Sequence, residues 1–194
     1  MENKKTALLL IDVQQAFQNE AYWGGNRNNP QAEQNIADLL ACWRGNNRPV
    51  VHVKHNSRNP DSPLHATNPG NRIMDCARPL DGEPLFEKQV NSAFIGTQLK
   101  TYLDEQEIKG LVIVGFITDH CVSTSARMAG NYGFAVYVAA DATATFDRIG
   151  PEGESYTSTD IHRISLASLH QEFATIMKTA DIISNAKTAC HALV

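Results

Sequence analysis

The stretch KGLVIVGFITDHCVSTSARMAG, residues 109–130, runs from an apolar segment through a polar turn into a series of small residues. The segment KGLVIVGF is almost continuously apolar, which predicts a β-strand covered on both faces. The following CVSTSARMAGNYG has the pattern of a helix that is closed by glycine. Because a buried strand that leads directly into a helix is the repeating unit of parallel sheets, this stretch predicts an α/β fold.

The rest of the chain repeats this alternation. Five further segments are predicted as strands: residues 6–13, 48–55, 85–90, 134–141 and 173–177. Right-handed crossovers between parallel strands place helices on both faces of the sheet. We therefore expect a single domain over residues 1–194, folded as a three-layer α/β/α sandwich around a mostly parallel, Rossmann-like six-stranded sheet.

Capping signals and apolar periodicity locate the helices and loops. Asn29 and Pro30 are predicted to be the N-cap and first residue of a helix. Segments 56–84 and 147–159 contain many turn-forming residues and are predicted to be mostly loop. Three helix faces are expected to hold Ile36, Leu39, Leu40 and Trp43; Phe94, Leu99 and Leu103; and Ile161, Ile164 and Leu169.

Charge and cysteine content restrict the partners and the compartment. The 194 residues carry 17 basic and 21 acidic side chains, a net charge of −4, without a Lys/Arg cluster suited to phosphate contacts. No apolar stretch reaches the length of a membrane span. The four cysteines, Cys42, Cys76, Cys121 and Cys190, lack CxxC spacing. These features predict a cytoplasmic protein with reduced thiols that binds neither nucleic acid nor membrane.

The predicted topology selects a small set of candidate site residues. In a parallel α/β sheet, ligands bind beyond the carboxyl ends of the strands, near the point where the strand order reverses. Five residues with ionisable side chains fall at or just after the end of an apolar segment: Asp12, His55, Lys88, Cys121 and Asp141.

Cys121 starts the helix predicted after the strand at 109–116. Unpaired backbone N–H groups and the helix dipole favour an anion there, which should lower the pKa of the thiol and favour the nucleophilic thiolate. Buried free cysteines also serve as packing residues, and position alone does not decide between the two roles. For Cys42, Cys76 and Cys190 we expect the packing role.

Asp12 and Lys88 could complete the chemistry of Cys121. Asp12 could take the thiol proton and return it to a leaving group, or it could cap backbone N–H groups. An ammonium group from Lys88 between carboxylate and thiol would stabilise both anions, whereas taken alone this lysine would be a solvated surface residue. The three residues together form a hypothesis that none carries singly.

Three sequence blocks resemble a known family. The blocks LLLIDVQQAF, FEKQVNSAF and GFITDHCVSTSARMA are similar, in the same order, to the signatures of the isochorismatase-like cysteine hydrolase superfamily. That superfamily includes nicotinamidases, N-carbamoylsarcosine amidase and ureidoacrylate amidohydrolases. The resemblance extends along nearly the whole chain through its strand and helix pattern.

The resemblance implies roles for individual residues. It makes Asp12, Lys88 and Cys121 a catalytic triad, and it implies a non-proline cis peptide between Phe116 and Ile117. The backbone N–H groups of Ile117 and Cys121 would then form an oxyanion hole. It also implies that Phe17 lines the pocket, whereas we expect Asp119 to support the turn or an N-terminal hydrogen bond.

The sequence departs from the metal-binding nicotinamidase pattern, in which an aspartate and histidines follow the second strand. His55 lies near the expected aspartate position and Ser57 near the first histidine. His52, His55 and His65 could still form a site, but alternation along the strand sends His52 and His55 to opposite faces. We therefore predict no metal and no other cofactor.

The activity implied by the resemblance is hydrolysis of a small amide, ureide or carbamoyl C–N bond through a Cys121 thioester. Vinyl ether hydrolysis of the isochorismatase type is an alternative, although in that branch the cysteine is often absent. The chain could instead be a redox-sensing binding protein that uses Cys121, or a catalytically silent member of the family. The resemblance also implies a homo-oligomer, either a dimer or a tetramer.

The substrate is not defined by these motifs. Candidate pocket residues are the aromatic side chains Phe17, Trp23, Phe86, Phe94 and Phe146. Candidate polar contacts are His55, Asn56, Arg58, Arg72 and His120. Of these, Phe17, Trp23, His55, Phe86 and His120 are the predicted substrate-binding set.

Overall fold

The computed structural model describes the backbone of residues 5–191 and the side chains of residues 5–188. Its centre is a six-stranded sheet in the order β3-β2-β1-β4-β5-β8, and every neighbouring pair is parallel. The strands are β1 (Thr6–Ile11), β2 (Val50–His55), β3 (Leu85–Lys88), β4 (Gly110–Phe116), β5 (Ala135–Ala144) and β8 (Thr175–Met177). The predicted α/β class and parallel sheet are confirmed.

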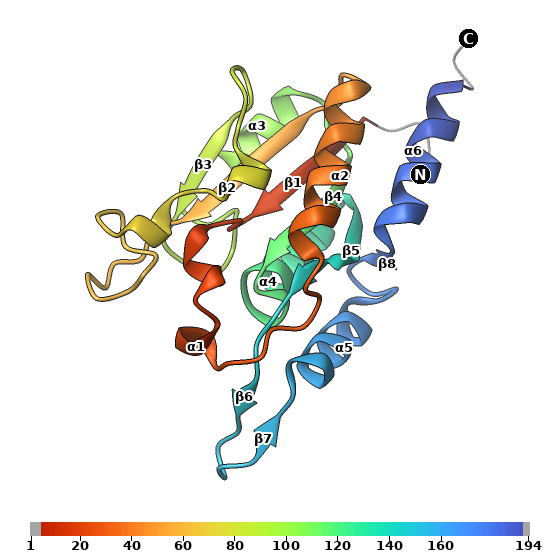
Figure 1. The fold of residues 1–194 in the computed structure, drawn as a ribbon. Coiled ribbons are helices and arrows are strands. Elements are labelled where there is room, and N and C mark those ends of the chain that lie inside the picture. The colour runs from red at the N-terminus through yellow and green to blue at the C-terminus, as the bar shows by residue number, and fades with distance from the viewer. Residues whose placement is uncertain (1–4, 192–194) are drawn as a thin grey trace.

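Helices cover both faces of the sheet. Figure 1 shows α2 (Ala32–Gly45) and α6 (Thr179–His191) in front of the sheet, and α3 (Leu99–Glu105) and α4 (Ser123–Asn131) behind it. Helix α5 (Ser158–Leu169) packs on the same side as α4. Short helical turns are η1 (Gln15–Gln18), α1 (Glu20–Trp23), η2 (Pro69–Asn71), η3 (Asp75–Ala77) and η4 (Thr118–Val122).

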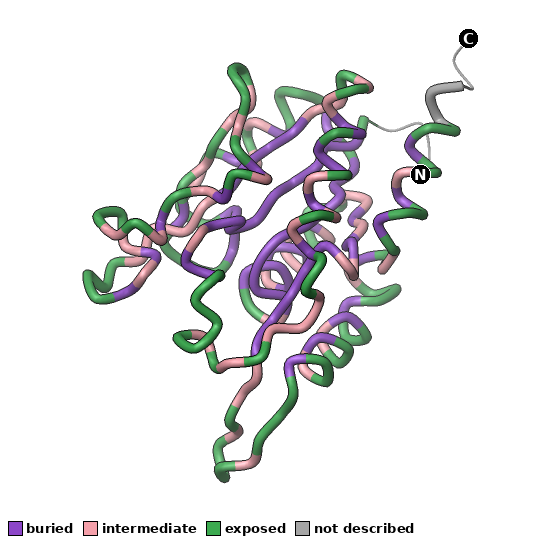
Figure 2. Tube along the Cα trace, in the orientation of Figure 1, coloured by how far each residue is buried: buried purple, intermediate pink, exposed green. Residues whose placement is uncertain are grey.

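The central strands are the most deeply buried elements, as the purple trace through β1 and β4 shows in Figure 2. Alternation along β1 sends Leu8 and Leu10 into the core under α2 and α6. Leu9 and Ile11 enter the other core, under α3, α4 and α5. Because both faces are covered, the strand reads as a continuous apolar segment rather than an alternating one.

The strand order reverses between β1 and β4. From β1 the chain moves outward to β2 and β3, and after the return to β4 it moves outward in the other direction to β5 and β8. The crevice at the carboxyl ends of β1 and β4 is therefore the switch point at which an open α/β sheet binds its ligands.

One predicted helix start and one predicted helix-face residue are wrong. Helix α2 begins at Ala32 rather than at Pro30. Asn29 instead takes a left-handed conformation, and its side-chain amide donates to the carbonyl oxygens of Ala140 and Thr143. Helix α3 begins at Leu99, so Phe94 precedes it.

The segment between β5 and α5 also differs from its prediction. Residues 147–159 hold an antiparallel hairpin, β6 (Arg148–Ile149) and β7 (Ser155–Tyr156), which projects from the molecule in Figure 1. In α5 the buried face carries His162, Leu166 and Leu169, whereas Ile164 is 64% exposed. The helix is therefore rotated relative to the predicted face.

None of the helices in the described part of the chain combines the length and the apolarity needed to span a membrane.

We predict that Gly115→Ala destabilises the fold more than an ordinary left-handed glycine replacement. Gly115 has φ +117°, and an added Cβ would lie 1.9 Å from the carbonyl oxygen of Ile11 in the neighbouring strand. Strain and overpacking together should lower the free energy of unfolding in urea by about 3 kcal/mol or more. Gly82→Ala, at φ +88° with open space around it, is the control and should cost only about 1 kcal/mol. Equal losses would show that the close strand contact is unimportant.

Candidate active site

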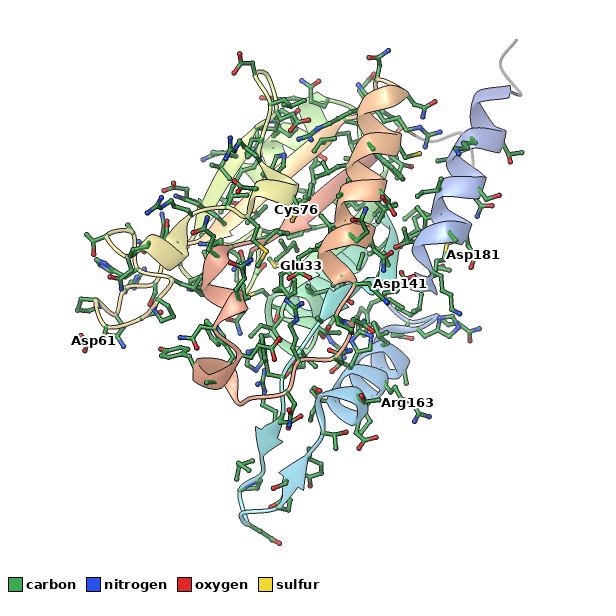
Figure 3. All side chains as sticks on the ribbon, viewed as in Figure 1. Glu33, Asp61, Cys76, Asp141, Arg163 and Asp181 are labelled. Carbon is green, nitrogen blue, oxygen red and sulfur yellow. The ribbon has the colours of Figure 1, made fainter. Side chains whose placement is uncertain are left out.

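Four adjacent strands each place one candidate residue at the carboxyl-terminal end of the sheet. Lys88 ends β3, His55 ends β2, Asp12 directly follows β1, and Cys121 lies in η4, after β4. The structure therefore brings together four of the five residues that the sequence selected. Asp141 does not join them, because its carboxylate accepts hydrogen bonds from Thr179 at the start of α6, beside which Figure 3 shows it.

The Lys88 ammonium stands at the centre of the cluster. Its Nζ donates to Asp12 Oδ2 at 2.6 Å and to Cys121 Sγ at 3.2 Å, and it lies 3.0 Å from His55 Nδ1. The side chains of Lys88 and Asp12 are both fully buried. Burial lowers the pKa of Lys88, but the negative charge of Asp12 and the hydrogen bonds to Asp12 and Cys121 outweigh it and raise that pKa above 10.5. The amine therefore stays protonated at neutral pH.

Asp12 is held by its backbone in an unusual conformation. Its φ is +53°, in the left-handed region that aspartate tolerates better than most residues, and its amide donates to Val53 of β2. While Oδ2 receives Lys88, Oδ1 is buried and has no hydrogen-bond partner within the described residues. A carboxylate oxygen of Asp12 lies within 4.8 Å of Cys121 Sγ. The carboxylate thus keeps an acceptor close to the thiol.

The Cys121 thiol is protonated in this resting site, contrary to the expectation of a lowered pKa. Burial raises the pKa of the thiol well above its ordinary value of 9.0, and the Asp12 charge raises it further, against the opposing charge of Lys88. The helix start is less important than predicted because the sulfur is buried against a carboxylate. Deprotonation therefore needs an acceptor close to the sulfur.

Asn91 is a site residue that the sequence analysis missed. Its Oδ1 lies 3.8 Å from Cys121 Sγ and accepts from the thiol, although the residue itself is exposed. It therefore covers the sulfur on the solvent side. The only sequence signal was its place inside the block FEKQVNSAF, three positions after Lys88.

The turn that carries Cys121 is fixed from several directions. The Phe116–Ile117 peptide is cis, as predicted. The Thr118 hydroxyl lies 3.0 Å from Nδ1 of the buried His162 on α5. Asp119 does not cap the turn; it accepts hydrogen bonds from Thr145 and Arg148, which follow β5.

The predicted aromatic contacts form three separate groups, one of which is Phe94 with Tyr132 and Phe134. Phe17 is buried and stacks at 5.5 Å on Phe116, beside the cis peptide, while half-buried Trp23 packs on Phe17 at 4.8 Å. Phe86 instead packs on Tyr102 of α3 at 5.7 Å.

The predicted polar contacts are equally dispersed. His120 is exposed beside Asp119. Asn56 and Arg58 bond to Glu87 and Gln89, and Arg72 is exposed. Asn56 also reaches Lys88, but only through its backbone amide, which donates to the Lys88 carbonyl oxygen. Among the described residues of this predicted polar set, His55 alone has a side-chain hydrogen bond to the side chain of Asp12, Lys88 or Cys121.

The three histidines considered as metal ligands do not meet. His52 points to the opposite face from His55 and bonds to Glu83 at 2.8 Å, and His65 bonds to Thr67. A different set, Asp12, His55 and Cys121, offers three ligand atoms within 4.8 Å of one another. The Lys88 ammonium already contacts all three side chains.

The remaining cysteines lie away from this site. Cys42 and Cys76 pack in or against the core under α2, on the opposite side of the sheet from Cys121. In Figure 3, Cys76 lies next to Glu33, and burial followed by the Glu33 charge raises the pKa of its thiol. The side chain of Cys190 lies outside the described residues. The packing role is thus confirmed for Cys42 and Cys76.

Comparisons with known proteins place this arrangement in a family. Residues 6–181 match the isochorismatase domain. The isochorismatase family protein YrdC of Bacillus subtilis is 45% identical over 185 residues, covering 95% of this chain and 97% of that protein. Nicotinamidase 3 of Arabidopsis thaliana is 28% identical over 185 residues, covering 89% of this chain and 84% of that protein.

A solved structure agrees with these matches. The crystal structure of a Chromobacterium violaceum protein assigned to the isochorismatase family of hydrolases has 39% sequence identity and a TM-score of 0.93, covering 97% of this chain and 96% of that one. Together, the domain match, the sequence relatives and the shared fold show that this chain belongs to the isochorismatase family of hydrolases.

Proposed function

We propose that the protein hydrolyses a C–N bond in a small amide, ureide or carbamoyl compound through a thioester on Cys121. The observation that carries this proposal is the buried Lys88 ammonium, which donates to both the Asp12 carboxylate and the Cys121 sulfur. A nucleophile, a proton acceptor and a fixed cation in one buried cluster are the parts that acyl transfer needs. Similarity to an amidase by name, Nicotinamidase 3, supports the same class.

In the first half of the reaction, Cys121 Sγ attacks the substrate carbonyl carbon while its proton passes to Asp12. The unpartnered Oδ1 is the acceptor that this step requires. Lys88 stays charged throughout and stabilises the sulfur as negative charge develops on it. The backbone N–H groups of Ile117 and Cys121 are the proposed donors to the oxyanion, and one such donor typically contributes about 3 kcal/mol in the transition state.

In the second half, the tetrahedral intermediate collapses and the C–N bond breaks. Asp12 gives its proton to the departing nitrogen, which leaves as ammonia or an amine and creates the thioester. Water then attacks the thioester carbonyl and gives a proton to Asp12. The C–S bond breaks, and the proton returns to sulfur to restore the resting thiol.

A redox-sensing role fits this geometry poorly. Sensor cysteines are exposed and have a lowered pKa, often beside a second thiol. Cys121 is only 8% exposed and its pKa is raised. Within the described residues, the sheet separates it from Cys42 and Cys76.

We further propose that the reaction needs no metal. A divalent ion bound by Asp12, His55 and Cys121 would have to displace the ammonium that now contacts each of them. Its positive charge would also face Lys88 inside a buried site. The substrate would instead be recognised by partly exposed side chains such as Trp23, with the buried Phe17 as support.

Cys121→Ala should abolish turnover and leave the unfolding midpoint nearly unchanged. The assay is the release of ammonia or amine from a panel of small amides, ureides and carbamoyl compounds. Cys76→Ala is the matched control, since it removes a thiol from the opposite side of the sheet, and should retain full activity. Unchanged hydrolysis by the Cys121 variant would disprove the nucleophile.

Lys88→Met should abolish turnover and also lower the free energy of unfolding by about 3–5 kcal/mol, because it leaves a buried carboxylate unpaired. The double variant Asp12→Asn/Lys88→Met removes both charges and keeps a residue that tolerates the left-handed backbone. It should recover most of the lost stability and none of the activity. A double variant as unstable as Lys88→Met would show that the ion pair does not set the stability of the site.

The raised thiol pKa predicts slow alkylation of Cys121 in the free protein. At pH 7.5, iodoacetamide should modify Cys121 at least about tenfold more slowly than it modifies the same cysteine in the urea-unfolded chain, because less thiolate is present. The rate should continue to rise above pH 9. Peptide mass spectrometry measures both rates, and a plateau below pH 8 would contradict the raised pKa.

A further inference from the structure

We infer that His55 is a positioning residue, whose Nδ1 accepts a hydrogen bond from the Lys88 ammonium and holds that ammonium between Asp12 and Cys121. This role differs from the substrate contact predicted for His55 from the sequence. It deepens the proposed amide hydrolysis and rests on it, because the value of a fixed ammonium lies in that reaction.

The strand order makes the contact between His55 and Lys88 unavoidable. Lys88 ends β3 at the edge of the sheet, whereas Asp12 follows β1, and β2 lies between these strands. The Lys88 side chain must therefore cross the end of β2 to reach Asp12. His55 is the last residue of β2 and is paired with Lys88 in the parallel register, so the two side chains leave the same face.

The backbone of His55 is fixed to the loop that carries Asp12. Gln14, which is fully buried, accepts the His55 amide at 2.8 Å and donates to the His55 carbonyl oxygen at 3.0 Å. Asn71 donates a second hydrogen bond to that carbonyl. The backbone of His55 is thus tied to the segment just after Asp12, which fixes the point from which the imidazole projects.

The imidazole supplies a hydrogen-bond acceptor for the third N–H of the ammonium. A lysine ammonium has three N–H donors and no acceptor, and here it has three neighbours: carboxylate, sulfur and Nδ1. Without Nδ1, one donor would be buried without a partner and the ammonium could rotate away from the sulfur. To accept, Nδ1 must carry a lone pair, so His55 must be the neutral Nε2–H tautomer.

The charges around His55 favour this neutral form. Burial lowers the pKa of His55 below 6.5, and the Lys88 ammonium lowers it further, while Asp12 opposes both. Among the described residues, the ionisable groups that face the ring are Lys88 at the end of β3, Asp12 just after β1 and the Cys121 thiol in η4. A protonated His55 would direct an N–H at the ammonium and add a second positive charge, so activity should fall as the pH drops through the His55 pKa.

Histidine NMR tests the contact without any substrate. Long-range ¹H–¹⁵N spectra of the full chain at pH 7.5, assigned by comparison with His55→Ala, should show His55 as the Nε2–H tautomer. An Nδ1–H tautomer, or an imidazolium at that pH, would overturn the inference whatever the activity assays give.

Two conservative variants separate positioning from substrate contact. An asparagine side chain places an acceptor near the position of Nδ1, whereas glutamine places a donor near that of Nε2. His55→Ala should lower kcat about 10- to 100-fold with little change in KM, and His55→Asn should restore most of kcat. Rescue by His55→Gln instead, or a loss confined to KM, would assign His55 to the substrate. His65→Asn, in the loop that follows β2, is the control and should match the wild type.

The two proposals fail separately. If the wild type shows the Nε2–H tautomer but hydrolyses nothing on the amide panel, the proposed function is wrong and the contact between His55 and Lys88 stands. If amides are hydrolysed and His55→Ala keeps the wild-type kcat and pH profile, the proposed function stands and the positioning role is wrong.

Discussion

The buried ion pair between Lys88 and Asp12 is the interaction on which the site depends. Taking two charges out of water costs several kcal/mol per ion. The pair therefore persists only if both groups are fixed in position and their other donors and acceptors have hydrogen-bond partners. Lys88 meets this requirement through the sulfur of Cys121 and the imidazole of His55. Asp12 has one oxygen without a hydrogen-bond partner in the described residues. That free oxygen can accept a proton.

The fold supplies this cluster through strand order rather than through loops. The carboxyl ends of four neighbouring parallel strands, β3, β2, β1 and β4, lie side by side. Each strand can therefore contribute one residue at a fixed spacing. Gly115 allows β4 to approach β1 closely just before the turn that carries Cys121. The site is therefore built on the buried central strands of the sheet, with the exposed Asn91 at its margin.

The sequence predicted the sheet, and it selected Asp12, Lys88 and Cys121, which lie together in the structure, because the apolar pattern and the family resemblance agree at these positions. Asp12 and Lys88 interrupt or end apolar segments, and a charge in that position is costly unless it faces a site. Weaker signals failed for physical reasons. Asn29 resembles a helix cap but bonds to β5, Ile164 fits the helical period yet faces solvent, and the pKa of Cys121 depends on burial that local position cannot reveal. The contact of Asn91 with the sulfur is visible only in the tertiary structure. The oligomeric state and the cytoplasmic location stay predictions.

The central claim is that substrates pass through one acyl intermediate on Cys121, and partitioning with hydroxylamine tests it most directly. Two amides with the same acyl group and different leaving amines would be hydrolysed with hydroxylamine present, and the ratio of hydroxamate to acid measured for each. A common thioester predicts the same ratio for both substrates, since the amine has left before water or hydroxylamine attacks. A ratio that changes with the leaving amine, or acid alone from both substrates, would contradict the account.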